Sequence, residues 1–378
     1  MIYLDSAATS FQKPVAVGRA METALREMSS PGRGGYPEAM RAAETLFSCR
    51  TELAELFHVS EPERVVFTMN ATHGLNIAIK SLVPYGGKVV ISGYEHNAVT
   101  RPLAALGADI RVASAPLFQP DMTVEAFEKE ITPDIDAVIC THVSNVFGAV
   151  QPVEAIAAIC RKNDVPFIID ASQSAGMLPL DMTALGAAFI AMPGHKGLYG
   201  PQGTGVLLCC EKTETSPLIE GGTGSVSLQQ DMPEFLPDRL EAGTHNVPGI
   251  AGLLEGVRFV RRLGEDTICM HERQLALRAS EGLRQIPGIS VCARRDLFSQ
   301  TGVLSFVPEG LDSELVGNTL AEEGYAVRAG MHCAPLAHRT AGTLESGTVR
   351  LSFSVFNRVE EVSQLLTALP EILKRLSA

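Results

Sequence analysis

The segment 165–200 reads VPFIIDASQSAGMLPLDMTALGAAFIAMPGHKGLYG, and it decides the fold because two apolar runs in it are each followed by polar residues. The runs 165–170 and 187–192 are rich in Ile, Val, Phe and Ala, and Asp170 ends the first. Short apolar runs bounded by Pro, Gly or Asp are typical of strands buried on both faces. The segment therefore predicts two strands of an α/β sheet, with candidate functional residues in the loops that follow them.

Further apolar runs of the same kind lie on either side of this segment. They occupy residues 64–68, 88–92, 109–114, 136–140 and 204–210. Helical patterns lie between several of them, at 72–83 and 153–163. This alternation predicts a seven-stranded, mostly parallel sheet with helices on both faces.

The pattern changes after about residue 250. A long helical stretch at 248–264 is followed by strand-like runs at 302–306 and 348–354 and a final helix at 358–376. We interpret this part as a smaller α+β domain. The predicted division is a large domain of residues 15–250, and a small domain of residues 1–14 and 251–378.

Composition limits the classes of function. The 378 residues are 46% hydrophobic and carry a net charge of −12, which argues against broad binding to nucleic acid or to anionic membranes. No apolar run reaches the roughly 18 residues of a membrane span. The start MIYLDSAATS lacks the pattern of a signal peptide, and the eight cysteines are scattered. We therefore expect a cytoplasmic protein with free thiols.

Three loops after predicted strands carry groups suited to chemistry. In 67–76 a strand leads into a helix, whose start near Ala71 and Thr72 could hold a phosphate, although Thr72 could equally be an N-cap. Asp170 could pair with a cationic ring nitrogen or merely cap the next helix. Lys196 follows His195 between glycines, a setting that favours Schiff-base chemistry over an ordinary surface lysine. A P-loop is excluded because the order of its residues is missing.

Two weaker candidates follow other strands. His96 in GYEHNAV could stack on a ring or move a proton, although a lone histidine is more often structural, and Asn145 in THVSNVFG could donate to a substrate. Taken together, the loops supply a lysine, an acid, an anion-binding helix start and a residue able to stack. These are the groups that pyridoxal phosphate requires.

The stretch YAVRAGMHCAPLAH (325–338) places Cys333 beside His332. The thiol could be reactive, could bind metal, or could simply fill the core. A zinc site needs three or four ligands at workable spacing, so we expect no metal. Gly330 suggests a mobile loop, which suits sulfur transfer to another protein. Arg350, between apolar neighbours in TVRLSFS, is suited to gripping a carboxylate.

The chain resembles pyridoxal-phosphate enzymes of the class V aminotransferase group, and most closely the group II cysteine desulfurases and selenocysteine lyases. The resemblance runs nearly end to end, in an ordered series of motifs: YLDSAATS, FTMNATHGLN, EHN, VSNVFGAVQPV, IDASQSAG, GHKGLYGPQGTGVL, EAGTHN, RAGMHCA and VRLSFSVFN. It implies a fold-type I transferase that acts as a homodimer.

The resemblance also implies a role for each matching residue. The cofactor would be held covalently by Lys196, at the ring nitrogen by Asp170, at the phenolic oxygen by Gln173 and on the ring face by His96. The phosphate would be bound by Ala71, Thr72 and His195, and by Thr244 from the partner subunit. The substrate carboxylate would be held by Asn145 and Arg350, with Arg328 lining the same pocket, and Cys333 would take the sulfur.

The activity that the resemblance implies is conversion of L-cysteine to L-alanine, with a persulfide formed on Cys333 for a sulfur-acceptor protein. Alternatives are selenocysteine lyase activity, another β-lyase activity, or a catalytically silent scaffold in a sulfur-transfer complex. Some positions depart from the family pattern. Pro193 stands where a hydroxyl residue is common before GHK, Ala71 replaces a frequent threonine, and the segment after Cys333 is unusual.

Overall fold

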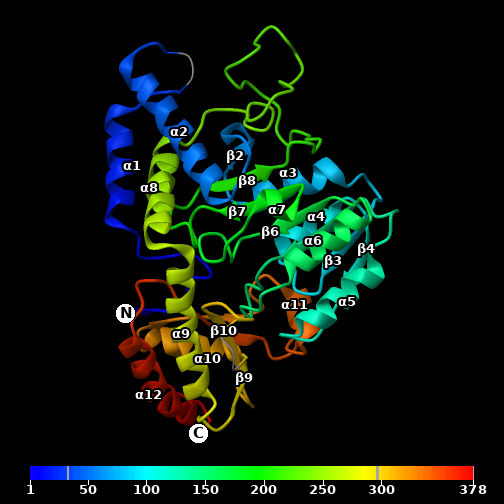
Figure 1. Ribbon diagram of the computed structural model, residues 1–378. Helices are drawn as coiled ribbons and strands as arrows, with labels where there is room; N and C mark the ends of the chain where they lie inside the picture. The colour runs from blue at the N-terminus through cyan, green and yellow to red at the C-terminus, as the bar shows by residue number, and fades with distance from the viewer. Residues whose placement is uncertain (32–33, 295–297, 378) are drawn as a thin grey trace.

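The computed structural model describes residues 1–31, 34–294 and 298–377, and Figure 1 shows a larger upper part above a smaller lower part. The large sheet has the spatial strand order β2-β8-β7-β6-β5-β3-β4. Its strands are β2 (Val65–Thr68), β3 (Lys88–Ser92), β4 (Asp109–Ala113), β5 (Ala137–Thr141), β6 (Phe167–Asp170), β7 (Phe189–Pro193) and β8 (Gly205–Cys209). Strand β8 is antiparallel to β2 and β7, and the other pairs are parallel. The predicted seven-stranded, mostly parallel sheet is confirmed.

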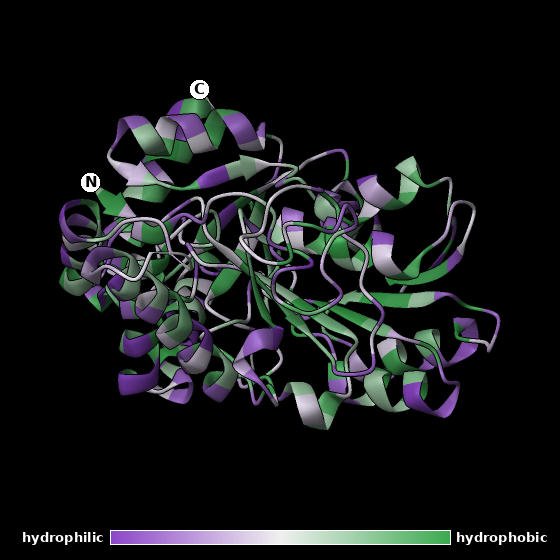
Figure 2. Ribbon diagram, turned by 90° about the horizontal axis from the view of Figure 1, so that it is seen from above, coloured by the Kyte–Doolittle hydropathy of each residue, from purple (hydrophilic) through white to green (hydrophobic). Residues whose placement is uncertain are grey.

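Helices cover both faces of this sheet, because its strands are apolar on both sides. In β5, Val138 packs into one core and Ile139 into the other, as the alternation of side chains along a strand requires. One core is closed by α2 (Pro37–Leu56), α5 (Pro120–Glu130), α6 (Val153–Lys162), α7 (Met182–Leu185) and α8 (Val247–Leu263), and the other by α3 (Ala71–Leu82) and α4 (Asn97–Ala105). Figure 2 shows the mostly green strands in the middle of the molecule, with helices around them that carry both green and purple segments.

The lower part is built on a four-stranded antiparallel sheet in the order β12-β13-β10-β9. Its strands are β9 (Ile289–Cys292), β10 (Val303–Pro308), β12 (Arg328–Gly330) and β13 (Thr348–Ser352). Helices α9 (Glu265–Leu283), α10 (Ser313–Glu322) and α12 (Val359–Leu376) share a third apolar core with this sheet. Strand β1 (Ile2–Tyr3) pairs in parallel with β11 (Tyr325–Ala326).

Helices α8 and α9 connect the two parts, and they meet at Gly264 (Figure 1). Helix α8 packs against α2 and against α1 (Val15–Glu27). Position 250, the predicted end of the large domain, lies inside α8. The division into residues 15–250 and residues 1–14 plus 251–378 stays a prediction.

The topology fixes where a ligand can bind. Successive strands run outward from β3 to β4 on one side and from β5 through β6 to β7 on the other. The loops after β3 and β5 therefore diverge at a switch point, where open α/β sheets bind their ligands. Helix α11 (Pro335–Ala341), which follows the loop with the exposed thiol, lies near α4 and α5 in Figure 1.

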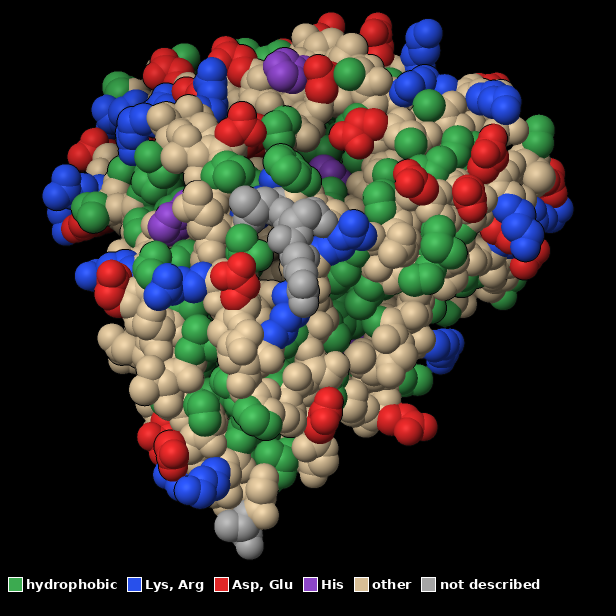
Figure 3. Space-filling view, turned by 60° about the horizontal axis from the view of Figure 1, so that its bottom comes forward, with side chains coloured by type: hydrophobic (Ala, Val, Ile, Leu, Met, Phe, Trp, Pro, Cys, Tyr) green, Lys and Arg blue, Asp and Glu red, His purple; other side chains and the backbone are tan. Residues whose placement is uncertain are grey.

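Within the described residues, no helix combines the length and the apolarity needed to cross a bilayer. Figure 3 shows one face of the molecule, on which acidic and basic side chains are interspersed. No continuous basic area is visible among the residues coloured there.

Candidate active site

A cavity of about 100 Å³ opens at the carboxyl edge of the large sheet. Its lining includes residues predicted from five separate loops: Ala71, Thr72, His96, Asn145, Asp170, Gln173, His195 and Lys196. The structure brings these together because the carboxyl ends of parallel strands meet at one edge. The other predicted residues lie outside this lining: Thr244, Arg328, Cys333 and Arg350.

Lys196 is presented by a tight turn after β7. A Cβ atom at Gly194 would lie 2.2 Å from Oγ1 of Thr204, and one at Gly197 would lie 2.3 Å from the carbonyl oxygen of Ala175. Real Cβ atoms do not approach so closely, so both flanking positions require glycine. The glycines seen in the sequence therefore serve close packing that aims the lysine into the cavity.

The electrostatic setting of Lys196 makes its amine lose a proton more readily than an ordinary lysine. Burial lowers the pKa of the amine to about 8, although the Asp170 carboxylate acts in the opposite direction. The residue keeps partial exposure because its side chain lines the cavity. Among the described residues, none accepts a hydrogen bond from its Nζ. A neutral, unengaged amine is what capture of an aldehyde needs.

Asp170 ends β6 and is 2% exposed. Its Oδ1 accepts a hydrogen bond of 2.9 Å from the backbone N–H of Ser172, which fixes the carboxylate at the strand end. The second oxygen has no partner among the described residues. The next helix is α7, and its N-cap is Asp181, so the alternative that Asp170 caps a helix was wrong. Asp170 instead orders the following turn and still presents one oxygen.

His96 is the N-cap of α4, and its Nδ1 accepts a hydrogen bond of 3.0 Å from the N–H of Ala98. This bond places the ring proton on Nε2. Burial lowers the pKa of His96, with Asp170 opposing the shift. The imidazole is therefore neutral near pH 7, and a neutral ring can stack on an aromatic ligand without adding charge.

The start of α3 supplies free backbone donors. Asn70 is its N-cap and accepts from the N–H of His73, so the alternative that Thr72 is the N-cap was wrong. The N–H groups of Ala71 and Thr72 have no partner among the described residues. Since α3 is a full helix of 12 residues, its first turn suits an anion.

The N-terminal segment covers the other side of the cavity. Oγ1 of Thr9 lies 3.0 Å from Nδ1 of His195, and the backbone carbonyl of His195 accepts from the N–H of Ser10 at 3.1 Å. Gln173 donates from Nε2 to the carbonyl of Ala7 at 3.0 Å. The sequence motif alone did not show that this segment packs against the cavity. The signal that could have shown it is the cluster of small and hydroxyl residues in the segment.

Cys333 is exposed, so the alternative of a core-filling thiol was wrong. It sits in a turn closed by a 2.9 Å hydrogen bond from the N–H of Ala334 to the carbonyl of Met331. Both central residues, His332 and Cys333, have positive φ, 51° and 56°. This is the pattern of a type I′ turn, which normally uses Gly or Asn, so two ordinary side chains there store strain.

Hydrogen bonds from the cavity wall hold this turn in place. The N–H of Asn97 donates to the carbonyl of Cys333 at 2.9 Å, and Nδ2 of Asn145 donates to the carbonyl of His332 at 2.8 Å. Nδ1 of His332 lies 3.4 Å from Nε2 of His338. Burial lowers the pKa of His332 to about 3, so this ring is neutral and adds no positive charge beside the thiol.

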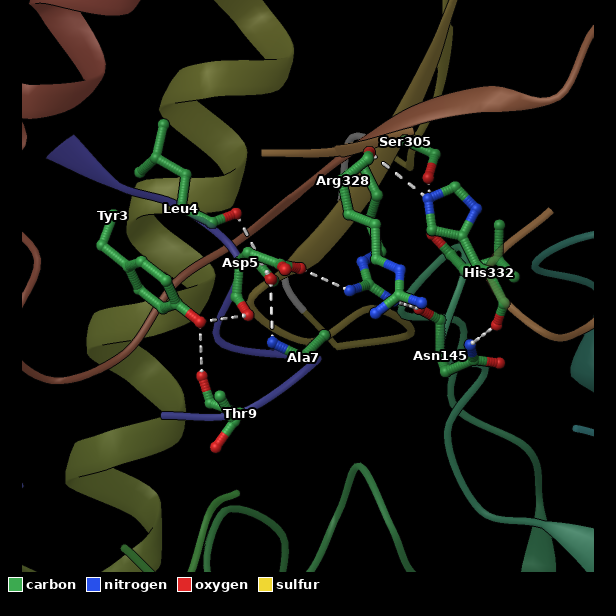
Figure 4. Close-up of polar contacts among 12 residues, drawn as sticks. Tyr3, Leu4, Asp5, Ala7, Thr9, Asn145, Ser305, Arg328 and His332 are labelled. Carbon is green, nitrogen blue, oxygen red and sulfur yellow. Dashed lines mark hydrogen bonds and ion pairs between the residues drawn. The ribbon is translucent and has the colours of Figure 1, made fainter. Parts of the chain in front are cut away.

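Arg350 in β13 is buried and reaches toward the same turn. Its Nη1 donates to the carbonyl of Asn145 at 2.9 Å, and its Nη2 pairs with Oδ1 of Asp5 at 2.6 Å. Figure 4 shows this network running from the N-terminal strand to His332. Asp5 could not be singled out from the sequence, because its partner Arg350 is far away in the chain.

Thr244 is exposed and lies on the rim of a separate cavity. Its loop is anchored by Glu241, which pairs with Arg50 at 2.5 Å and with His245 at 2.5 Å. Thr244 does not line the Lys196 cavity of its own chain.

A family model, described as aminotransferase class-V, matches residues 2–365. The chain belongs to this family. Curated relatives of this class V chain include a probable cysteine desulfurase of Methanothermobacter thermautotrophicus, 34% identical over 98% of this chain and 94% of the relative. Another is a probable cysteine desulfurase of Mycolicibacterium paratuberculosis, also 34% identical, of which the chain spans 55%.

Solved structures of similar shape carry the same description. The apo structure of a cysteine desulfurase from Thermococcus onnurineus superimposes with a TM-score of 0.90 at 32% identity, covering 99% of this chain and 95% of that one. A cysteine desulfurase (S-sulfonic acid) from Escherichia coli gives a TM-score of 0.87 at 28% identity, with the same coverage.

Proposed function

We propose that this class V protein is a pyridoxal-phosphate-dependent cysteine desulfurase, which converts L-cysteine to L-alanine and receives the sulfur as a persulfide on Cys333. One observation carries the proposal. The turn that carries the exposed Cys333 is tied to the residues around the Lys196 cavity: the N–H of Asn97 donates to the carbonyl of Cys333, and Nδ2 of Asn145 donates to the carbonyl of His332. A core thiol or a metal ligand would not need that placement.

The residues present fit the cofactor. The free N–H groups of Ala71 and Thr72 suit a phosphate, and Asp170 keeps one oxygen available for a ring nitrogen. Lys196 supplies an amine whose pKa is about 8. Pro193 lines the cavity without a hydroxyl, so the phosphate relies on the helix start and on His195. In this assignment Gln173 meets the phenolic oxygen and His96 covers the ring face.

When bound, the cofactor supplies an electron sink for the carbanion formed at Cα. Lys196 accepts the Cα proton, because its amine is neutral once the substrate has displaced it. Asp170 holds a proton on the ring nitrogen through its charge. Arg350 and Asn145 orient the substrate carboxylate, and Arg328, opposite Arg350 in the small sheet, adds a second positive charge beside them.

The sulfur step balances without an added oxidant. The Cys333 thiolate attacks the substrate sulfur, an S–S bond forms as the C–S bond breaks, and the carbon fragment takes up a proton to become alanine. The sum is L-cysteine plus a thiol giving L-alanine plus a persulfide. Cys333 is exposed, so the persulfide can pass to an acceptor protein.

The proposal includes a homodimer in a reducing, cytoplasmic setting. Thr244 is exposed at a loop rim and would reach the phosphate bound by the partner subunit. All eight cysteines are free, which suits a compartment that keeps thiols reduced. Light scattering measures the mass, and mixing Thr244→Ala with Lys196→Ala protein tests the shared site, since mixed dimers would regain one intact site.

The decisive experiment is incubation of the holoenzyme with L-cysteine, followed by mass spectrometry of the Cys333 peptide. We expect one added sulfur atom on Cys333 and one alanine released per turnover. The matched control is Cys210→Ala, which removes another partly accessible thiol and should behave as wild type. Unmodified Cys333 after full cofactor loading would refute the proposal.

The variant Cys333→Ala separates the alternatives. Loss of activity on L-cysteine with retained activity on L-selenocysteine would indicate a selenocysteine lyase. Failure to bind pyridoxal phosphate, seen as absence of its visible absorbance, would indicate a scaffold.

A further inference from the structure

Two arginines face each other in the small sheet. Arg328 in β12 and Arg350 in β13 are direct partners in the antiparallel register. Directly opposed residues project from the same face of a sheet, and like charges there are unfavourable. Arg350 is 2% exposed, so solvent cannot screen its charge. The pair therefore needs a nearby anion.

Asp5 provides that anion, and the fold fixes its position. Its backbone forms a bridge to Ser352, two residues after Arg350. The hydroxyl of Tyr3 lies 2.8 Å from the carbonyl oxygen of Thr9, to which it donates, and 3.1 Å from the carbonyl oxygen of Asp5, closing the loop that carries the carboxylate (Figure 4). The Arg350–Asp5 contact of 2.6 Å is thus built into the sheet edge.

The hydrogen bonds of Arg350 leave one useful pair of donors. A guanidinium has five N–H groups. One on Nη1 goes to the carbonyl of Asn145, and one on Nη2 goes to Asp5. Nε is buried without a partner among the described residues. What remains is one N–H on each terminal nitrogen, and two such N–H groups can bind a carboxylate.

The charges of this cluster sum to a single positive unit. Arg328 and Arg350 contribute two, and Asp5 removes one. Burial, aided by Asp5, raises the pKa of Tyr3 to about 12, and burial lowers that of His332 to about 3, so both are neutral near pH 7. One bound carboxylate would bring the cluster to neutrality.

We propose that Asp5 is a positioning and specificity-determining residue: it holds Arg350 with one pair of N–H groups open and sets the charge of the pocket to accept a single carboxylate. The inference rests on the proposed function in taking the ligand to be an amino acid whose carboxylate Arg350 holds. It adds the N-terminal strand to the substrate pocket and predicts discrimination against dianions.

The test compares two anions, propionate and malonate, by calorimetric titration of the holoenzyme. The variant Asp5→Asn keeps an acceptor for Arg350 and raises the cluster to two positive charges. We expect the ratio of malonate to propionate affinity to rise on the order of tenfold. The exposed Arg328→Gln, which lowers the cluster to zero, should reduce the ratio by a similar factor. Lys196 and Asp170 are unchanged throughout.

The double variant Asp5→Asn/Arg328→Gln restores the single positive charge and should restore the wild-type ratio. If Asp5 had only a structural role, removal of an exposed arginine would not restore the affinity ratio. Asp109→Asn, an exposed site on β4, controls for overall net charge and should leave the ratio unchanged.

An unchanged ratio in both single variants, or a double variant that does not return to wild type, would overturn the inference. If Asp5→Asn alone does not fold, the double variant is compared with Arg328→Gln, because these two proteins differ only at Asp5 and the ratio should be higher in the double variant. The outcomes also separate this inference from the proposed function. A shifted ratio in a protein that never forms a persulfide would sink the desulfurase alone, and turnover of L-cysteine with an unshifted ratio would sink the role of Asp5 alone.

Discussion

Glu241 is the centre of the most densely bonded buried ion pair in the described structure, and its removal gives a quantitative test. Its carboxylate accepts from Arg50 at 2.8 and 2.5 Å, from the N–H of Phe67 at 2.5 Å, and lies 2.5 Å from Nε2 of His245. The Arg50 and Glu241 side chains are 7% and 4% exposed. The variant Glu241→Gln leaves the Arg50 cation buried without a counter-charge, which costs about 3–5 kcal/mol.

Such a loss is a large share of the stability of a typical domain, which is about 5–15 kcal/mol. Urea unfolding of the apoprotein, followed by circular dichroism, measures it. The double variant Arg50→Met/Glu241→Met removes both charges, and we expect it to recover at least half of the loss, because no unpaired charge remains. The reasoning is refuted if the double variant is as unstable as Glu241→Gln.

The same pair predicts a dependence on pH. Burial raises the pKa of Glu241, but the Arg50 charge and the His245 hydrogen bond outweigh it, so the net pKa is lowered. An unfolded glutamate titrates near pH ~4.3. The carboxylate therefore stabilises the fold above that pH, and its contribution is lost as the pH falls through the lower folded value. The difference between wild type and Glu241→Gln should shrink in acid and stay constant from pH 6 to 8.

Three further predictions concern the candidate site and its surroundings. Because the pKa of Lys196 is lowered to about 8, the rate at which the apoprotein captures pyridoxal phosphate should level off near pH 8 in stopped-flow absorbance, and Lys196→Ala should show no such capture. Burial raises the pKa of Glu272 to about 8, so the folded protein holds a proton that the unfolded chain releases near pH ~4.3. The free energy of unfolding, measured by urea titration, should therefore fall as the pH rises between these two values, and Glu272→Gln should abolish that fall. Asn145→Ala removes the 2.8 Å bond that holds the strained thiol turn, so alkylation of Cys333 by iodoacetamide should speed up several-fold while that of Cys210 stays constant; equal rates at Cys333 would show that the turn needs no such support.

Local sequence determined the elements of the large sheet. The run predicted at 88–92 is β3, and those predicted at 136–140 and 187–192 differ from β5 and β7 by one or two residues. These strands are buried on both faces, so their apolar runs were unbroken and bounded by turn residues. The candidate functional residues in the loops after these strands could also be predicted, because the carboxyl ends of parallel strands lie at one edge of the sheet.

Contacts between residues far apart in the chain could not be predicted from the sequence. Asp5 and Arg350 are 345 positions apart, and no periodicity links them. The N-cap of α3 is Asn70 and not Thr72, because cap geometry depends on where the strand releases the chain. Likewise the I′ turn at Cys333 has neither Gly nor Asn at its centre, so composition could not reveal it.

The sequence by itself determined the sheet, the order of its loops and the lysine, acid and thiol on which the proposed chemistry depends. These follow from hydrophobic burial and chain direction, which are local properties. Tertiary structure alone decided how the N-terminal strand meets Arg350 and how the cavity wall holds the Cys333 turn. Those arrangements arise only when the small sheet packs against the switch point of the large one, since a buried charge or a strained turn takes its partners from whichever segments packing brings beside it.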